Sequence, residues 1–168
     1  MSDSFPALAF IAFLLLQRGA ELVLARYNTR RLLARGAVEH GAGHYPLVVL
    51  LHATWLLAIA MLGWSNLVHL GWLAAFAVLQ LLRVWVLASL GPRWTTRIIV
   101  LDEPLVARGP YRWLPHPNYA VVIAEIIVAP MVLGLWQVAG IFTLLNAAVL
   151  TIRIRAEGRA LGLDKAKD

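Results

Sequence analysis

Apolar segments long enough to cross a bilayer alternate with short polar segments along this chain of 168 residues. A helix needs ~20 apolar residues to span ~30 Å of hydrocarbon. Three segments have that length, and a fourth, nearly uncharged stretch is too long for one span and has a turn signal near Gly134. The pattern predicts an all-α polytopic membrane protein with five transmembrane helices, the last two forming a short helical hairpin whose first arm is kinked or shortened by Pro130. The predicted spans are residues 5–24, 46–63, 67–90, 120–134 and 137–152.

The composition fits one integral membrane domain over residues 1–168. Hydrophobic residues make up 61% of the chain and charged residues only 14%, which a soluble domain of this size could not bury. The absence of cysteine excludes disulfides, thiolate metal sites and a cysteine nucleophile. The first apolar segment has no basic region before it and is interpreted as a retained helix rather than a cleaved signal peptide.

Basic residues predict how the protein is oriented. Thirteen of the fifteen lysines and arginines follow the first, third or fifth predicted span, and the two turns on the other side carry no charge. By the positive-inside rule, the N-terminus is expected outside and the C-terminus in the cytoplasm. The net charge of +6 is therefore attributed to contact with anionic lipid headgroups, and no nucleic acid partner is expected.

Several ionisable or amide side chains lie inside the predicted spans, among them Arg18, Glu21, Gln80, Arg83 and Glu125. Arg18 and Glu21 are three positions apart and share a helix face, so they can pair, either to hold helices together or to serve the function directly. Gln80 and Arg83 repeat this spacing, and Arg83 either extends to the interface or holds a substrate. Glu125 needs a cation partner, for which Arg18, Arg83 or a ligand are candidates. We expect all five to line a lipid-side cavity for the substrate.

Two histidines flank the start of the second predicted span. His44 and His52 are eight positions apart and so lie roughly on one helix face, beside Tyr45. They are interpreted either as interfacial anchors or as residues that line a cavity. A metal site is not expected, because no third ligand has suitable spacing.

The longest polar segment, 91–118, contains the most distinctive motif. Residues Ile98 to Val100 are β-branched and predict a short extended piece. Then follow, in order, Gly109-Pro110-Tyr111, His116-Pro117-Asn118-Tyr119, the apolar hairpin, and Arg153 with Glu157. The last two are four positions apart and share a helix face, which alone would also fit an ordinary surface pair.

This order of motifs resembles the isoprenylcysteine carboxyl methyltransferase family, which are integral membrane enzymes that use S-adenosyl-L-methionine. The resemblance covers about residues 96–161. It implies a cofactor site formed by the cytoplasmic loop, the hairpin and the C-terminal tail. By the resemblance, Arg153 faces the methyl acceptor and, with Glu157, is catalytic. The residues implied to bind the cofactor are Leu105, Val106, Tyr111, His116, Pro117, Asn118, Tyr119 and Glu157.

Two positions depart from the family pattern. Pro115 stands where an arginine is usual, and Gly158 replaces the second of two glutamates. The first change stiffens the loop and removes a cation, and the second leaves a single carboxylate. His116 also has the chemistry of a general base, although the family pattern places it at the cofactor.

The first hundred residues contain Gln17-Arg18 with Glu21, then Arg35 to Glu39 with His44 to Pro46, and then Arg93 to Ile98. These motifs are similar to those of a bacterial branch of the family that is associated with type III polyketide synthases. That branch implies a protein of the bacterial inner membrane. It also implies methylation of a hydroxyl on a long-chain alkylpyrone or alkylresorcinol that enters from the bilayer. The alternatives are carboxyl methylation of an isoprenylcysteine-type substrate and, from another class, a membrane scaffold or small transporter. Transporters usually carry internal repeats, and none is visible in this chain.

Overall fold

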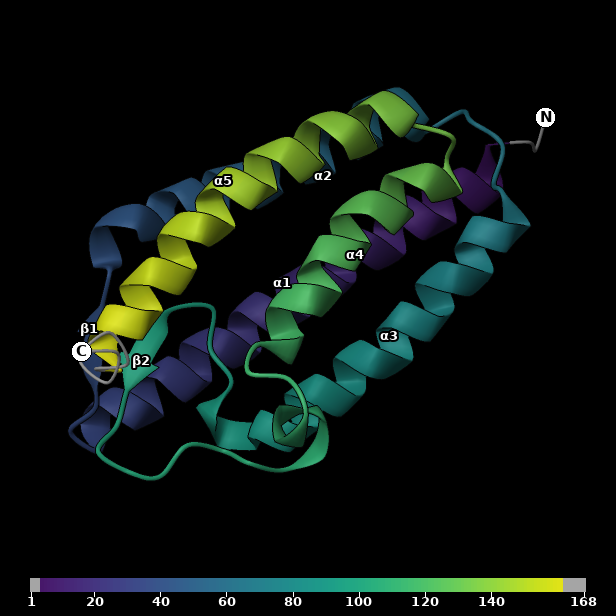
Figure 1. The fold of residues 1–168 in the computed structure, drawn as a ribbon. Coiled ribbons are helices and arrows are strands. Elements are labelled where there is room, and N and C mark those ends of the chain that lie inside the picture. Colours follow the sequence, from purple (N-terminus) through teal and green to yellow (C-terminus); the bar gives the residue numbers. More distant parts are fainter. Residues whose placement is uncertain (1–3, 162–168) are drawn as a thin grey trace.

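Five α-helices and one small sheet make up the computed structural model, which describes residues 4–161 (Figure 1). Four of the helices are long and apolar enough to cross a membrane, whereas α4, with 16 residues, is a shorter apolar helix. The prediction of a mostly helical protein with several helices able to cross a membrane is confirmed. A fifth crossing, by α4, stays a prediction. The helices are α1 (Phe5–Ala34), α2 (Tyr45–Gly63), α3 (Leu70–Leu90), α4 (Pro117–Val132) and α5 (Trp136–Ala160).

Two helices are longer than the apolar segments that predicted them. Helix α1 has 30 residues and is about 45 Å long, so it continues ten residues past the predicted span. Helix α5 has 25 residues and ends at Ala160, so the second arm of the hairpin is longer than the predicted span, and Arg153 and Glu157 lie on one continuous helix, as their spacing predicted. Both extensions are rich in Arg and Ala, which favour helix, but the charged residues keep them from marking a span.

The turn between α4 and α5 lies where the sequence predicted it. Gly134 has a φ of 69°, a left-handed conformation that glycine adopts at little cost. Pro130 lies in the last turn of α4, and its carbonyl accepts hydrogen bonds from the amides of Leu133 and Leu135. Pro130 therefore marks the shortened end of α4 rather than a kink within a longer helix.

A two-stranded antiparallel sheet joins two loops that are far apart in the sequence. Strand β1 (Val38–His40) pairs with β2 (Ile98–Val100), with Val38 opposite Val100. The extended piece predicted at residues 98–100 is confirmed, although its partner strand was not predicted. Arg97 beside β2 forms an ion pair of 2.7 Å with Glu39 in β1, and this pairing raises the pKa of the Arg97 guanidinium.

The sheet marks one end of the bundle, called here the sheet end. Helices α1, α3 and α5 end there, and α2 and α4 begin there (Figure 1). The described basic residues that follow the first, third and fifth predicted spans therefore gather at one end, as the orientation prediction requires, whereas Lys165 and Lys167 lie outside the described residues. The buried apolar core lies toward the other end, where Phe10, Trp55 and Phe76 pack with Ile126 and Val132. Polar residues can therefore occupy the space between this core and the sheet.

Candidate active site

A cavity of about 240 Å³ lies between α1, α2, α4 and α5. Its walls are mostly apolar and include Val48, Val122 and Leu150. The loop that joins α3 to β2 contributes Trp94 and Thr96 to its wall. Such a space suits an apolar molecule with one polar group.

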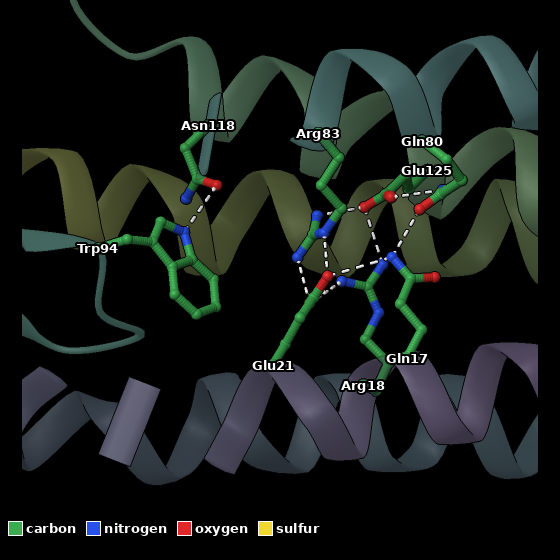
Figure 2. A network of polar contacts seen from close by, with 8 residues as sticks. All are labelled: Gln17, Arg18, Glu21, Gln80, Arg83, Trp94, Asn118 and Glu125. Carbon is green, nitrogen blue, oxygen red and sulfur yellow. Dashed lines mark hydrogen bonds and ion pairs between the residues drawn. The ribbon is translucent and has the colours of Figure 1, made fainter. Parts of the chain in front are cut away.

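Four charged side chains from three helices form a closed ring of ion pairs beside this cavity (Figure 2). Arg18 contacts Glu21 at 2.9 Å and Glu125 at 2.8 Å. Arg83 donates from Nη2 to Glu21 Oε2 and from Nη1 to Glu125 Oε2, both at 2.5 Å. Each arginine therefore contacts both carboxylates, and the formal charge of the ring is zero.

Two amide side chains form further hydrogen bonds with the carboxylates of the ring. Gln17 donates to Glu21 at 3.1 Å and to Gln80 at 2.6 Å, and Gln80 donates to Glu125 at 2.9 Å. Buried charges are tolerated when each is paired, and within the described residues only Gln17 Oε1 and Arg18 Nε of this network are buried without a hydrogen-bond partner. The network ties α1 to α3 and α4 at membrane depth.

The ring decides several of the alternatives left open by the sequence. The pairing of Arg18 with Glu21 is confirmed, and Glu125 contacts both of its candidate arginines. Arg83 is only 5% exposed and points inward, so its interpretation as an interfacial anchor was wrong. Arg18, Glu21 and Arg83 line the cavity, whereas Glu125 and Gln80 are not part of its wall. Contact between Glu125 and a substrate stays a prediction.

A second polar cluster lies at the sheet end, where α4 begins and α5 ends. The rings of His116 and Tyr119 stack at 5.2 Å between centroids with an interplanar angle of 18°. The Tyr119 hydroxyl donates a hydrogen bond to the Glu157 carboxylate, and His116 Nδ1 lies 3.9 Å from Glu157 Oε2. The motif residues that are 38 to 41 positions apart in the sequence are thus brought together.

Local helix structure explains how this cluster is positioned. Pro117 begins α4, a position where its fixed φ and missing amide hydrogen are no disadvantage. Helix α5 continues past the apolar segment, so Arg153 and Glu157 lie one turn apart on one face. The long second arm of the hairpin is therefore what carries Glu157 to His116.

Arg153 and Glu157 are not an ordinary surface pair. Arg153 Nη1 donates to the Thr96 carbonyl at 2.9 Å, and its guanidinium lies 5.7 Å from the centre of the Tyr119 ring. Glu157 instead accepts from Tyr119. Arg153 Nε is buried without a hydrogen-bond partner, and no carboxylate among residues 4–161 pairs with this side chain. Arg153 therefore carries an uncompensated positive charge at the wall of the cavity.

Tyr111 and Asn118 extend the cluster. The Tyr111 hydroxyl is buried without a hydrogen-bond partner in the described part of the chain. Burial raises the pKa of this hydroxyl, and the nearby Glu157 and Tyr119 raise it further, so the phenol stays protonated and can donate. Asn118 lines the cavity and accepts a long hydrogen bond of 3.5 Å from Trp94 Nε1 (Figure 2).

Leu105 and Val106 lie elsewhere. Val106 lines a separate surface hollow together with Arg35, Arg93 and Arg108. Leu105 is 66% exposed. No contact recorded for the described residues joins either one to the cluster of His116, Tyr119 and Glu157, and their assignment to a cofactor site stays a prediction.

The structure adds residues that the sequence signalled weakly or not at all. His52 and Tyr45 line the cavity, but His44 does not. Asn146 on α5 lines it too and is 5% exposed, with no hydrogen bond from its side chain to the described residues. An amide in the middle of a mostly apolar span was the available signal for Asn146. Among residues 4–161, no group of three or more potential metal ligands is found.

Comparison with known proteins identifies the family. A sequence model described as the isoprenylcysteine carboxyl methyltransferase (ICMT) family matches residues 72–162. The chain belongs to this family. The ICMT match contains the loop, α4, α5 and the second polar cluster, whereas α1 and α2 lie outside it.

One relative extends the similarity over the remaining helices. The uncharacterized protein YpbQ of Bacillus subtilis (strain 168) is 40% identical over 157 residues, which cover 90% of this chain and 94% of that protein. No solved structure matches the chain. ICMT family membership and four apolar helices together indicate an integral membrane methyltransferase.

Proposed function

We propose that this protein transfers a methyl group from S-adenosyl-L-methionine to a lipophilic acceptor that enters the cavity from the bilayer. The observation that carries the proposal is the junction of the second polar cluster with the cavity. Tyr119 belongs to both, because its hydroxyl binds Glu157 while the residue also lines the cavity wall beside Arg153. A donor at the cluster and an acceptor in the cavity would meet there.

The residues of the cluster fit the cofactor. Bound S-adenosyl-L-methionine supplies an electrophilic methyl group on a positively charged sulfur. Glu157 is suited to ribose hydroxyls or the cofactor's ammonium group, and the unpartnered Tyr111 hydroxyl can donate a further hydrogen bond. The stacked rings of His116 and Tyr119 offer a face to the adenine or to the sulfonium. The protein then contributes mainly by positioning the reactants and excluding water.

The apolar walls favour a long-chain acceptor, and we propose a hydroxyl of an alkylpyrone or alkylresorcinol. Arg153 would stabilise the negative charge that develops on the acceptor oxygen. An isoprenylcysteine-type carboxylate is the second candidate, because the uncompensated charge of Arg153 suits it as well. In either case the protein would span the membrane five times, with its N-terminus outside and its C-terminus in the cytoplasm.

Titration calorimetry tests the cofactor site. S-adenosylhomocysteine titrated into the detergent-purified protein is expected to bind, and His116→Ala and Glu157→Gln each to weaken the affinity by about tenfold or more. Arg155→Gln is the matched control, because Arg155 lies on the same helix turn but is exposed. If the folded wild-type protein does not bind, the proposal fails and a scaffold becomes the better interpretation. Unchanged affinity in both variants would place the cofactor elsewhere.

A further inference from the structure

His52 lines the cavity from α2 in a defined tautomer. Its Nδ1 lies 2.9 Å from the Val48 carbonyl one turn earlier in the helix. A carbonyl can only accept a hydrogen bond, so Nδ1 carries the hydrogen and Nε2 has a free lone pair. Nε2 has no hydrogen-bond partner among the described residues. The imidazole is further held by an edge-to-face contact with Trp55, with centroids 6.5 Å apart.

The chemistry of Nε2 specifies what it can bind. A bare imidazole nitrogen accepts a hydrogen bond, so its complement is a donor such as a hydroxyl. A carboxylate, which only accepts, gains nothing from it. No hydrogen bond joins Nε2 to a nearby arginine among the described residues: those of the ring bind Glu21 and Glu125, Arg153 donates to Thr96, and Arg18 Nε and Arg153 Nε have no partner. The remaining titratable groups that line the cavity are Tyr45 and Tyr119.

We propose that His52 Nε2 accepts the hydrogen bond of the acceptor's hydroxyl and takes its proton during methyl transfer. This inference rests on the function proposed above. The O–H bond breaks and its proton goes to Nε2. The oxygen forms a bond to the methyl carbon, and the C–S bond of the sulfonium donor breaks with its electron pair passing to sulfur. One positive charge is lost at sulfur and one is gained on the imidazole, so the net charge of the site does not change.

This assignment makes the acceptor a hydroxyl compound rather than a carboxylate. A neutral hydroxyl is a poor nucleophile and gains reactivity as its proton is removed. A carboxylate is ionised at neutral pH and needs no base. His52 can therefore act as a general base in the methylation of a hydroxyl, whereas the methylation of a carboxylate needs no such base.

Binding without cofactor is the first test. We expect wild-type protein to bind 5-pentadecylresorcinol about tenfold more tightly than its dimethyl ether, because only the free hydroxyl can donate to Nε2. His52→Phe should remove this preference, and His52→Gln, which keeps an acceptor oxygen, should retain part of it. Thr54→Val is the matched control, because Thr54 also bonds the carbonyl four residues earlier but lies outside the cavity wall. An equal preference in wild type and His52→Phe would overturn the proposal.

Methyl transfer is the second test. His52→Gln should lower kcat/KM for 5-pentadecylresorcinol by about 100-fold or more, the usual contribution of a general base. The loss should be smaller for a ring-chlorinated analogue, whose hydroxyl is more acidic. N-acetyl-S-farnesylcysteine, if it is a substrate, should be affected little. A uniform loss for all three acceptors would assign His52 a packing role and overturn the proposal.

The affinity for S-adenosylhomocysteine separates this inference from the proposed function. If wild type binds it and methylates the resorcinol while His52→Gln is equally active, the inference fails and the function stands. If wild type neither binds it nor methylates any of the three acceptors, both fail. We expect S-adenosylhomocysteine to bind wild type and His52→Gln with the same affinity.

Discussion

Arg18 and Glu125 are 107 positions apart in the sequence, and their side chains form an ion pair of 2.8 Å between α1 and α4. Arg18 is supplied by a helix outside the region that the ICMT family model matches, and Glu125 by a helix inside it. The pair thus couples the matched part of the chain to α1.

Removing one member of the ring should be strongly destabilising. Glu125→Leu leaves two buried arginines with one carboxylate, which we expect to lower the free energy of unfolding by about 3–5 kcal/mol. The double variant Arg18→Leu with Glu125→Leu leaves the neutral pair of Arg83 and Glu21 and should be more stable than Glu125→Leu alone. Equilibrium unfolding in mixed micelles measures both.

The exposed pair of Arg35 and Glu103 is the control for this experiment. Its side chains are 51% and 35% exposed, and Arg35→Leu should cost no more than about 1 kcal/mol. If the double variant is no more stable than Glu125→Leu, the prediction is wrong, and the loss of stability in Glu125→Leu does not come from the unpaired positive charge.

Gly109 should be required by the backbone rather than by a ligand. Its φ is 58°, and a Cβ at this position would lie 2.1 Å from Ser89 Oγ and 2.9 Å from Ser89 Cβ. We expect Gly109→Ala to destabilise the protein by more than about 1 kcal/mol, seen as a lower apparent Tm in detergent. Gly71→Ala is the control, because a Cβ there meets nothing within 4 Å. An unchanged Tm for Gly109→Ala would show that the loop can adopt another path.

Hydropathy predicted where helices exist but not where they end. The turn at Gly134 was predictable because a 33-residue apolar stretch cannot be a single span. The end of α1 was not, because its last turns are polar and resemble a loop on a hydropathy scale. The spacing of Arg153 and Glu157 predicted that they share a helix face, but it left a surface pair open because their partners, Thr96 and Tyr119, come from other parts of the chain.

Contacts between residues that are far apart in the sequence were the second feature that could not be predicted. The spacing of Arg18 and Glu21 predicts a local pair, but the closure of the ring depends on how α1, α3 and α4 pack. In the same way, Ile98–Val100 is recognisable as a strand, whereas three residues at Val38–His40 carry too little pattern to be identified as its partner. Contacts of this kind depend on tertiary structure, which the pattern along one chain does not contain.

Arg153 should affect the acceptor and not the cofactor. It lines the cavity and has no carboxylate partner in the described part of the chain, so its charge is available to an acceptor oxygen. Arg153→Gln should lower kcat/KM for the acceptor by about 10- to 100-fold, the value of a hydrogen bond to a charged group. Its affinity for S-adenosylhomocysteine should stay within about twofold of wild type.

The exposed Arg155 on the same helix provides the control for Arg153. Arg155→Gln should leave kcat/KM unchanged. Equal losses in the two variants would mean that the positive charge of the helix end matters and not the position of Arg153.

Cysteine labelling tests the number of spans and the orientation, because the chain contains no cysteine of its own. Ser65 lies in the turn between α2 and α3, Gln137 follows the turn between α4 and α5, and Asp102 follows β2, and all three are exposed. A membrane-impermeant maleimide applied to intact cells should label Ser65→Cys and Gln137→Cys. It should label Asp102→Cys only after permeabilisation, because the arginine-rich sheet end is expected in the cytoplasm. Labelling of Gln137→Cys together with Asp102→Cys, and not with Ser65→Cys, would mean that α4 does not cross the membrane.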